Sequence, residues 1–386
     1  MAKHALLSAS GARRWLACTP SAKLEAQFPN ESTAYAEEGT IAHAVCELTA
    51  RYFLGEVSEP DYENQLQELS RNKYYTNEMR ECAVEYAKLI KNKIEGTYAF
   101  CSDAFAILET RVDFSKWVKN GFGTSDCVIV ADNILEVVDF KFGKGVPVAA
   151  EDNPQMKLYA LGAYEKYKTL YDIEQVRMTI FQPRLSDKPL EYTCEIFDLL
   201  TWAETVVRPK AKLAYEGKGD FAPSAETCKF CRAKEQCRAR AEQNLKMFDD
   251  SPDPLLISVD EAGAILNRAG DIQAWLSDLE NLVTNSLMSG ESVAGWKLVE
   301  GRSVRKFADE QKVVEAMKAA GFDEAMLYER KLLTLAQMEK DFGKKAVAET
   351  LSDLIIKPRG KPTLAKASDR RAEFKPTEQI MEAFDA

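Results

Sequence analysis

Three charged residues, Asp126, Asp139 and Lys141, could together bind a metal ion and a phosphodiester. Asp139 and Lys141 end the segment Leu135–Lys141 (LEVVDFK), whose apolar and β-branched residues predict a strand. Because side chains at i and i+2 share one face of a strand, both point the same way. Hard divalent cations prefer carboxylate ligands, and an ammonium group can stabilise charge that develops on a phosphoryl group. The alternative is a solvated hairpin without a chemical role.

A tight turn would bring Asp126 to the other two groups. Asp126–Ala131 (DCVIVA) predicts a second strand, and the Asp-Asn dipeptide that follows suits a two-residue hairpin. If the residues flanking that dipeptide pair with each other, Asp126 lies directly opposite Asp139. Opposed residues in an antiparallel pair have β-carbons roughly 4.5–5.5 Å apart. The sequence therefore predicts two carboxylates and an ammonium on one face, a set that suits Mg²⁺ or Mn²⁺.

Three further polar side chains could support such a site. Gln155 and Tyr159 are four residues apart in the predicted helix Asn153–Lys168, so they share one face. From there an amide and a hydroxyl could reach a DNA phosphate or the attacking water, although such a pair is more often half-buried and structural. His43 lies at the edge of the apolar stripe of the predicted helix Glu37–Leu54. It is either a structural histidine or a further metal ligand.

A second candidate site consists of cysteines. Cys228, Cys231 and Cys237 follow one another closely, and a C-x2-C pair with a third nearby cysteine is typical of a thiolate-bound metal or cluster. Cys18 is the predicted fourth ligand, since it too lies near a helix end beside a proline. Zinc and a 4Fe–4S cluster fit four thiolates equally well. The alternative is a loop of unligated thiols, and the remaining cysteines are expected to be small buried side chains.

Bulk composition excludes several classes of protein. The chain has 386 residues, enough for more than one domain, and 46% are hydrophobic, which is typical of a globular protein. Its nine cysteines are an odd number and argue against a disulfide framework. Its two histidines argue against a multi-histidine zinc hydrolase. The polar start and the lack of a long apolar run predict a cytoplasmic protein.

Charge gives weaker guidance about partners. A net charge of −10 argues weakly against nucleic acid, but a metal nuclease site is itself made of carboxylates, and the bound metal reverses the local sign. Basic residues are concentrated in Lys357–Lys375, which is either a solvated tail or a DNA contact. No GxxxxGK[ST] phosphate loop is present, so an ATP-driven helicase is not expected.

Apolar periodicity and turn-forming residues predict the order of helices and strands along the chain. The predicted helices of the first part are Ser8–Leu24, Glu37–Leu54, Thr76–Tyr98, Asn153–Lys168 and Leu199–Tyr215, and the predicted strands are Ala106–Val112, Asp126–Ala131, Ile134–Phe140, Val176–Gln182 and Cys194–Phe197. After a linker at 250–254, the pattern predicts helices Val259–Met288, Asp309–Gly321 and Leu333–Leu354 and a hairpin Gly295–Phe307. Residues 356–386 are predicted to be a basic, partly disordered tail.

Taken together, these motifs resemble a known family. The GTIAH segment around His43, the GTSD and VVDFK pair, the NPQMKLYALG helix and CKFCRAKEQC are similar to PD-(D/E)XK nucleases of the RecB/AddB type, including the CRISPR-associated exonucleases. The resemblance covers about residues 5–240. Within this superfamily the chain is similar to the phage and prophage group DUF2800, whose C-terminal signature resembles LIIKPRGKPTLAKASDRR. The resemblance to these nucleases implies an α/β, restriction-endonuclease-like core over residues 1–245, with a mixed central sheet flanked by helices. A mainly helical domain over residues 255–355 would follow.

The resemblance also implies roles for individual residues. The family's metal centre of histidine, two acids and lysine corresponds to His43, Asp126, Asp139 and Lys141, and its QxxxY motif to Gln155 and Tyr159. The implied ion is Mg²⁺ or Mn²⁺, and Glu109 is the family's possible initial carboxylate. Cluster-bearing members hold a 4Fe–4S cluster with cysteines that correspond to Cys18, Cys228, Cys231 and Cys237; Zn²⁺ is the alternative.

The expected function is therefore that of a metal-dependent DNA exonuclease, encoded by a phage or prophage and active in recombination, repair or replication. Its expected partners are linear DNA ends or single strands and a single-strand-binding or recombination protein, and no membrane. The alternative from another class is a catalytically silent DNA-binding or partner-binding module that retains the four-cysteine metal site.

Overall fold

The computed structural model describes residues 5–30, 33–249 and 258–299, together with short stretches between 310 and 354. The chain divides into two compact units, Met1–Val293 and Ala294–Ala386. None of the helices in the described part combines the length and apolar character that crossing a membrane requires.

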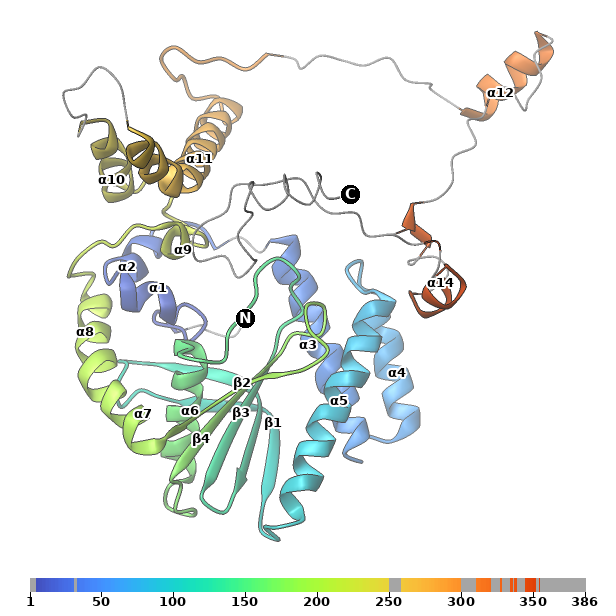
Figure 1. The fold of residues 1–386 in the computed structure, drawn as a ribbon, viewed down its shortest axis with the longest axis vertical. Coiled ribbons are helices and arrows are strands. Elements are labelled where there is room, and N and C mark those ends of the chain that lie inside the picture. The colour runs from blue at the N-terminus through green and yellow to red at the C-terminus, as the bar shows by residue number, and fades with distance from the viewer. Residues whose placement is uncertain are drawn as a thin grey trace, which may run out of the picture. The chain divides into compact units, whose positions relative to one another are not determined.

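A five-stranded sheet forms the centre of the first unit (Figure 1). Its strands are β1 (Phe105–Asp113), β2 (Phe122–Ala131), β3 (Ile134–Phe140), β4 (Gln175–Phe181) and β5 (Leu190–Glu195), in that spatial order. β3 and β4 are parallel, and the other neighbours are antiparallel. The parallel pair requires a crossover connection, which α6 (Pro154–Tyr167) supplies. The expected mixed sheet flanked by helices is confirmed.

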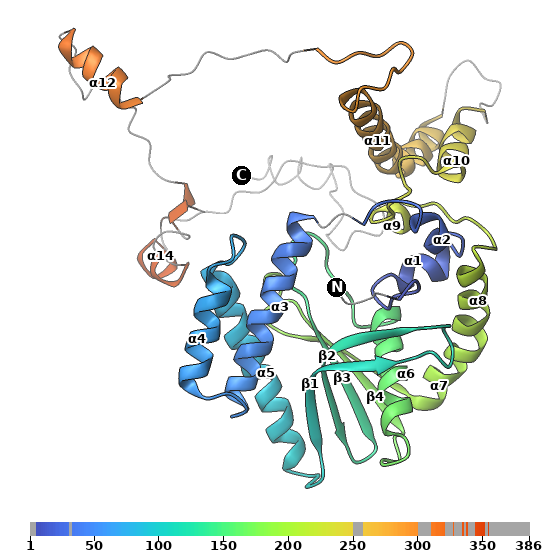
Figure 2. The same ribbon diagram turned by 180° about the vertical axis from the view of Figure 1, so that it is seen from behind.

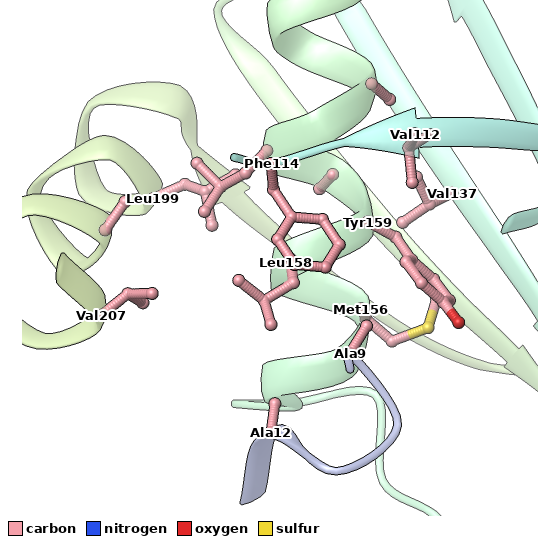
Figure 3. Close-up of a cluster of buried hydrophobic side chains, with 14 of the residues drawn as sticks. Ala9, Ala12, Val112, Phe114, Val137, Met156, Leu158, Tyr159, Leu199 and Val207 are labelled. Atoms are coloured by element: carbon pink, nitrogen blue, oxygen red, sulfur yellow. The ribbon is translucent and has the colours of Figure 1, made fainter. Parts of the chain in front are cut away.

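Helices cover both faces of this sheet, as the view from behind also shows (Figure 2). On one face, α3 (Ala34–Phe53), α4 (Glu59–Ser70) and α5 (Asn77–Tyr98) enclose a core that includes Phe140. On the other face, α6 packs with α1 (Ala12–Ala17), α7 (Ile196–Trp202) and α8 (Arg208–Glu216). Figure 3 shows this second core, in which Leu158 and Tyr159 of α6 lie near Phe114 and Val137.

Side-chain caps explain where the helices that carry the site begin. Thr33 accepts a hydrogen bond from the Ala36 amide at the start of α3, and Thr76 caps α5 in the same way. At α6, Asn153 accepts from two backbone amides while Pro154 occupies the first turn, where a missing N–H costs nothing. The predicted helices in these three places are confirmed, with ends shifted by a few residues.

Four predictions about secondary structure were wrong or incomplete. The strand predicted at Cys194–Phe197 is β5 at Leu190–Glu195, and α7 begins at Ile196. The predicted helix Ser8–Leu24 is two short helices, α1 and α2 (Ser21–Glu25), because the chain breaks at Cys18 before Pro20. The predicted helix Leu199–Tyr215 is interrupted by a π-helical turn at Ala203–Val207. Helix α4 was missed, although its Ser58 cap and early proline are local start signals.

The C-terminal part of the first unit contains α9 (Ala225–Cys228), α10 (Arg238–Asp249) and α11 (Val259–Met288). The bounds predicted for α11 are confirmed, and Ser258 with Glu261 forms a capping box at its start. Arg240 of α10 donates to Asp278 of α11 at 2.6 Å in a largely buried contact. This ion pair ties the two helices together.

The second unit is described only in part. It contains α12 (Glu310–Ala319) and α14 (Lys344–Leu351), which overlap the two helices predicted there. The predicted hairpin Gly295–Phe307 is described only at residues 295–299, which contain no strand, and its remaining residues lie outside the described part of the chain. The linker at 250–254, the basic run Lys357–Lys375 and the tail at 356–386 lie outside the described residues.

Candidate active site

Three carboxylates stand in a row across three neighbouring strands. The expected register of the hairpin, with Ala131 opposite Ile134, is confirmed. Continued along β2 and β3, this register places Asp126 opposite Asp139. The register of β1 with β2 likewise places Glu109 opposite Asp126. The row therefore runs Glu109, Asp126, Asp139 through the middle of the sheet.

His43, Glu109 and Asp126 form the group with metal-ligand geometry in the described part of the chain. One potential ligand atom from each lies within 4.8 Å of the others. His43 Nδ1 is 3.4 Å from Asp126 Oδ2, and the same oxygen accepts the backbone amide of Phe140 at 2.7 Å. Glu109 has a φ of 47°, a left-handed conformation that costs free energy in a non-glycine residue. Such strain is characteristic of functional sites.

The electrostatics of this group favour a bound cation. Burial, together with the charges of Asp126 and Glu47, raises the pKa of Glu109 to about 7. Burial alone would lower the pKa of His43, but the hydrogen bond and charge of Asp126 raise it. Clustered negative charge thus makes protons or a metal ion favourable at the same place.

Asp139 and Lys141 form the second half of the site. Lys141 Nζ is 2.9 Å from Asp139 Oδ2, and Asp139 is only 2% exposed. Asp139 Oδ2 therefore forms an ion pair with the Lys141 ammonium. Burial raises the pKa of Asp139, although the charge of Lys141 opposes this. Burial alone would lower the pKa of Lys141, but the charge of Asp139 raises the pKa of that lysine. Lys141 is therefore held as an ammonium ion.

Helix α6 brings an amide and a phenol to the same place. Gln155 Nε2 donates to Asp139 Oδ1 at 3.1 Å and lies 3.3 Å from Tyr159 Oη, while Gln155 Oε1 accepts from Lys141 Nζ at 3.3 Å. Gly123 allows the ring of Tyr159 to approach β2, because a β-carbon there would lie 2.7 Å from Tyr159 Cε1. The glycine of the GTSD motif thus has a steric role.

The structure brings the predicted site residues together in two linked groups. The first group is His43, Glu109 and Asp126, whose potential ligand atoms lie within 4.8 Å of one another. Asp139 is not part of that group and instead contacts Lys141 and Gln155, and Gln155 contacts Tyr159. Glu109 was named only through the family resemblance, since the chain between β1 and β2 is too long to fix their register from a turn. One signal in the sequence could have indicated it. Glu109 is a charged residue that directly follows the apolar residues Ala106–Leu108 of a predicted strand.

The four predicted cluster cysteines line one small pocket. Cys18 comes from the junction of α1 and α2, and Cys228, Cys231 and Cys237 come from α9 and the turns after it. Their sulfur atoms do not form a set within 4.8 Å of one another in the described residues, whereas four thiolates on one zinc ion at 2.3 Å would be roughly 3.8 Å apart. Burial and Glu25 raise the pKa of Cys231 to about 11, so this thiol stays protonated unless a cation replaces the proton.

The fold and these side chains define an α/β protein with a candidate metal site of carboxylates and a histidine on adjacent strands. The chain belongs to the DUF2800 family, described as a protein of unknown function, whose model matches residues 4–372.

Three solved structures show distant similarity. SSO0001 has 16% sequence identity and a TM-score of 0.23, with 50% of this chain and 85% of that chain covered. A protein from Eubacterium rectale described as a candidate exonuclease has 12% identity and a TM-score of 0.31, with 66% and 92% covered. LHK-Exo, solved in complex with dAMP, has 12% identity and a TM-score of 0.22, with 44% and 88% covered. At such values the activity of this chain has to be inferred from its own side chains.

Proposed function

We propose that this chain is a metal-dependent deoxyribonuclease that degrades DNA from linear ends or along single strands. The observation that carries the proposal is the row Glu109, Asp126 and Asp139 across three strands, with His43 on one side and Lys141 on the other. The choice of DNA and of the exonuclease mode follows from the sequence resemblance described above, as does action beside a single-strand-binding or recombination protein.

The donor set fits Mg²⁺ or Mn²⁺. Carboxylate oxygens suit both ions, and the pKa of Glu109, raised by burial and by the charge of Asp126, indicates that the negative charge around it is not fully compensated. His43, Glu109 and Asp126 would hold the ion. Asp139, which lies outside that group, is proposed as a further ligand on the sequence resemblance alone. When bound, the ion would polarise a phosphoryl oxygen and lower the pKa of a water molecule.

The chain's own residues have separate tasks in the proposed hydrolysis. The Lys141 ammonium would face the place where negative charge develops on the phosphoryl group, and its half-buried position strengthens that interaction. Gln155 holds Lys141 and Asp139 in fixed orientation through its two amide atoms. Tyr159 supports Gln155 from the next turn of α6. Water attack on phosphorus needs no covalent enzyme intermediate.

We further propose that Cys18, Cys228, Cys231 and Cys237 bind a 4Fe–4S cluster, with Zn²⁺ as the alternative. Their common pocket supports a shared ligand. The choice of the cluster over zinc rests on the sequence resemblance, since four thiolates suit either.

The nuclease proposal is tested on an end-labelled linear duplex and a labelled single strand with Mn²⁺, Mg²⁺ or EDTA. We expect cleavage with the metal ions only, and about a 100- to 1,000-fold slower reaction for Lys141→Ala, since removing one electrostatic donor typically costs that much. Lys144→Ala is the control, because Lys144 lies on the surface and pairs with Glu78 at 3.1 Å. If no metal ion supports cleavage, or if Lys141→Ala cuts as fast as the wild type, the proposal is wrong and a silent binding module remains.

A further inference from the structure

A basic pocket lies outside the site described above. It has a volume of about 860 Å³ and is lined by six cationic side chains: Lys23, Lys116, Lys119, Arg208, Lys212 and Lys218. They come from α2, from the connection between β1 and β2, and from α8 with the residues after it. Among the lining residues Glu216 is the one acid. In a chain of net charge −10, this concentration of positive charge calls for an anionic partner.

Half of these cations have no acidic partner in the described structure. Lys116, Arg208 and Lys218 pair with Glu165, Glu204 and Glu216 at 2.7, 2.7 and 3.0 Å. In contrast, Lys23, Lys119 and Lys212 form no ion pair within 4.0 Å of a described carboxylate, and all three are exposed. Their charge is therefore available to a ligand.

Tyr215 and Gly217 fix two of the available lysines. Lys119 Nζ lies 4.5 Å and Lys23 Nζ lies 5.9 Å from the centroid of the Tyr215 ring, within reach of a cation–π attraction. Gly217 ends α8 with a φ of 72°, and a β-carbon there would lie 2.9 Å from Lys23 Cβ. The glycine thus permits α2 and α8 to approach closely.

The same junction is held by a hydrogen bond. Thr19 Oγ1 donates to the carbonyl of Lys218 at 2.7 Å, across a large separation in sequence. These contacts hold α2 beside α8 and so fix the positions of the lysines that these segments contribute to the pocket.

We propose that this basic pocket binds the phosphate backbone of the DNA substrate away from the cleaved bond. The choice of DNA among polyanions rests on the proposed nuclease function. Ammonium groups from three segments suit a chain of phosphates, which they neutralise as point charges without reading sequence. Of the aromatic residues in the lining, Trp117 donates its Nε1–H to Glu204 at 2.9 Å and so does not offer it to a base. The ammonium groups are therefore the main expected contacts, and they select phosphates.

The test compares two triple variants in a Lys141→Ala background, so that DNA is not cut. Lys23→Gln/Lys119→Gln/Lys212→Gln removes the available charges of the basic pocket. Lys73→Gln/Lys88→Gln/Lys91→Gln is the matched control, which changes net charge equally at surface positions before and on α5. Binding to a fluorescent single-stranded oligonucleotide is measured by anisotropy over a range of KCl concentrations.

The pocket variant should bind roughly 100-fold more weakly at 0.1 M salt, and its log–log salt slope should become shallower by about 2, because each single-strand phosphate contact contributes about 0.7. The control should keep the parental slope. Equal loss in both variants, or no loss in the pocket variant, overturns the proposal. A second arm of the experiment measures binding to vesicles that contain phosphatidylglycerol. If the pocket variant loses binding to these vesicles but not to the oligonucleotide, the DNA proposal is also overturned.

Failure of this inference is distinguishable from failure of the nuclease proposal. Metal-dependent cleavage by the chain with Lys141 intact, together with unchanged binding by the pocket variant, would refute only the pocket. Lysine-dependent DNA binding by a chain that never cuts would support the pocket and refute the nuclease.

Discussion

At the scale of single residues, the candidate site depends on side chains that constrain one another's charge. Asp126 contacts His43 directly and raises its pKa against the effect of burial. Asp139 does the same for Lys141. Three neighbouring carboxylates without a cation repel one another, and the left-handed backbone of Glu109 is a further cost of placing the third acid there.

The smallest residue near the site provides a sharp prediction. Gly123→Ala would put a β-carbon 2.7 Å from Tyr159 Cε1, so the ring must move. We expect a destabilisation of about 1–3 kcal/mol, typical of overpacking, and slower cleavage because Gln155 loses its neighbour. Urea denaturation and the cleavage assay measure these effects.

Gly143→Ala is the control for that experiment, since a β-carbon at Gly143 meets nothing within 4 Å. A Gly123→Ala protein with the stability and activity of the wild type would show that Tyr159 is not packed against β2 in this way.

At the scale of elements, α6 does two jobs. It is the crossover that makes β3 and β4 parallel, and its first turns carry Gln155 and Tyr159 to the ends of the active strands. The beginning of the helix is therefore also a part of the site. Asn153 fixes that beginning by accepting from two amides and by donating to the carbonyl of Ala149.

Loss of this cap should affect stability and activity together. We expect Asn153→Ala to lower the free energy of unfolding by about 1–2 kcal/mol and to slow cleavage, while Asn153→Asp keeps the acceptor and most of the stability. Ser58→Ala removes the cap of α4 and should cost about 1 kcal/mol without slowing cleavage. Equal activity of the Asn153→Ala and Ser58→Ala proteins would contradict the role assigned to α6.

The α10–α11 pair predicts a dependence of stability on pH. Burial alone would raise the pKa of Asp278, but hydrogen bonds from Arg240 and Lys234 lower it in the folded protein. A lowered folded-state pKa stabilises the protein above the unfolded value of about 3.9, and that contribution is lost as pH falls through the folded-state value.

Asp278→Asn should therefore cost about 3 kcal/mol near neutral pH, because it removes the 2.6 Å partner of the buried Arg240 and leaves that charge only the longer 3.9 Å contact with Asp271. The difference from the wild type should shrink as pH falls below about 4. Denaturant unfolding over a pH series measures this, with the exposed Asp220→Asn as control. A difference that does not change with pH would contradict the ion pair.

At the scale of the whole molecule, the cysteine pocket connects distant parts of the sequence. Cys18 precedes the sheet and the other three cysteines follow it, so a ligand bound by all four would close a loop around the central fold. Closing a long loop restricts the unfolded chain and raises the stability of the folded one.

Removing one ligand should expose that contribution. Cys231→Ser should lose bound iron and visible absorbance and lower the free energy of unfolding by several kcal/mol, as structural metal sites do. Cys194 is not among the residues that line the pocket, so Cys194→Ser should retain the bound iron, the visible absorbance and the stability. Iron analysis, the absorption spectrum and thermal melting are independent of catalysis. A colourless protein that contains zinc would select the alternative metal, and a metal-free protein with wild-type stability would refute the site.

The sequence alone determined the parts of the site that depend on neighbours in the chain. The hairpin register that opposes Asp126 and Asp139, the shared face of Asp139 and Lys141, and the start of α6 all follow from two-residue periodicity, a two-residue turn and a helix cap. Each of these is a local rule, and each needs only a few consecutive residues.

Only the tertiary structure decided which distant segments meet. It placed Glu109 beside Asp126, divided the carboxylates into two linked groups, and gathered lysines from three segments around one pocket. Periodicity fixes the direction of a side chain within its own element. The contacts between elements depend on how whole faces pack, through close approaches such as that of Gly217 to Lys23, which no short stretch of sequence specifies.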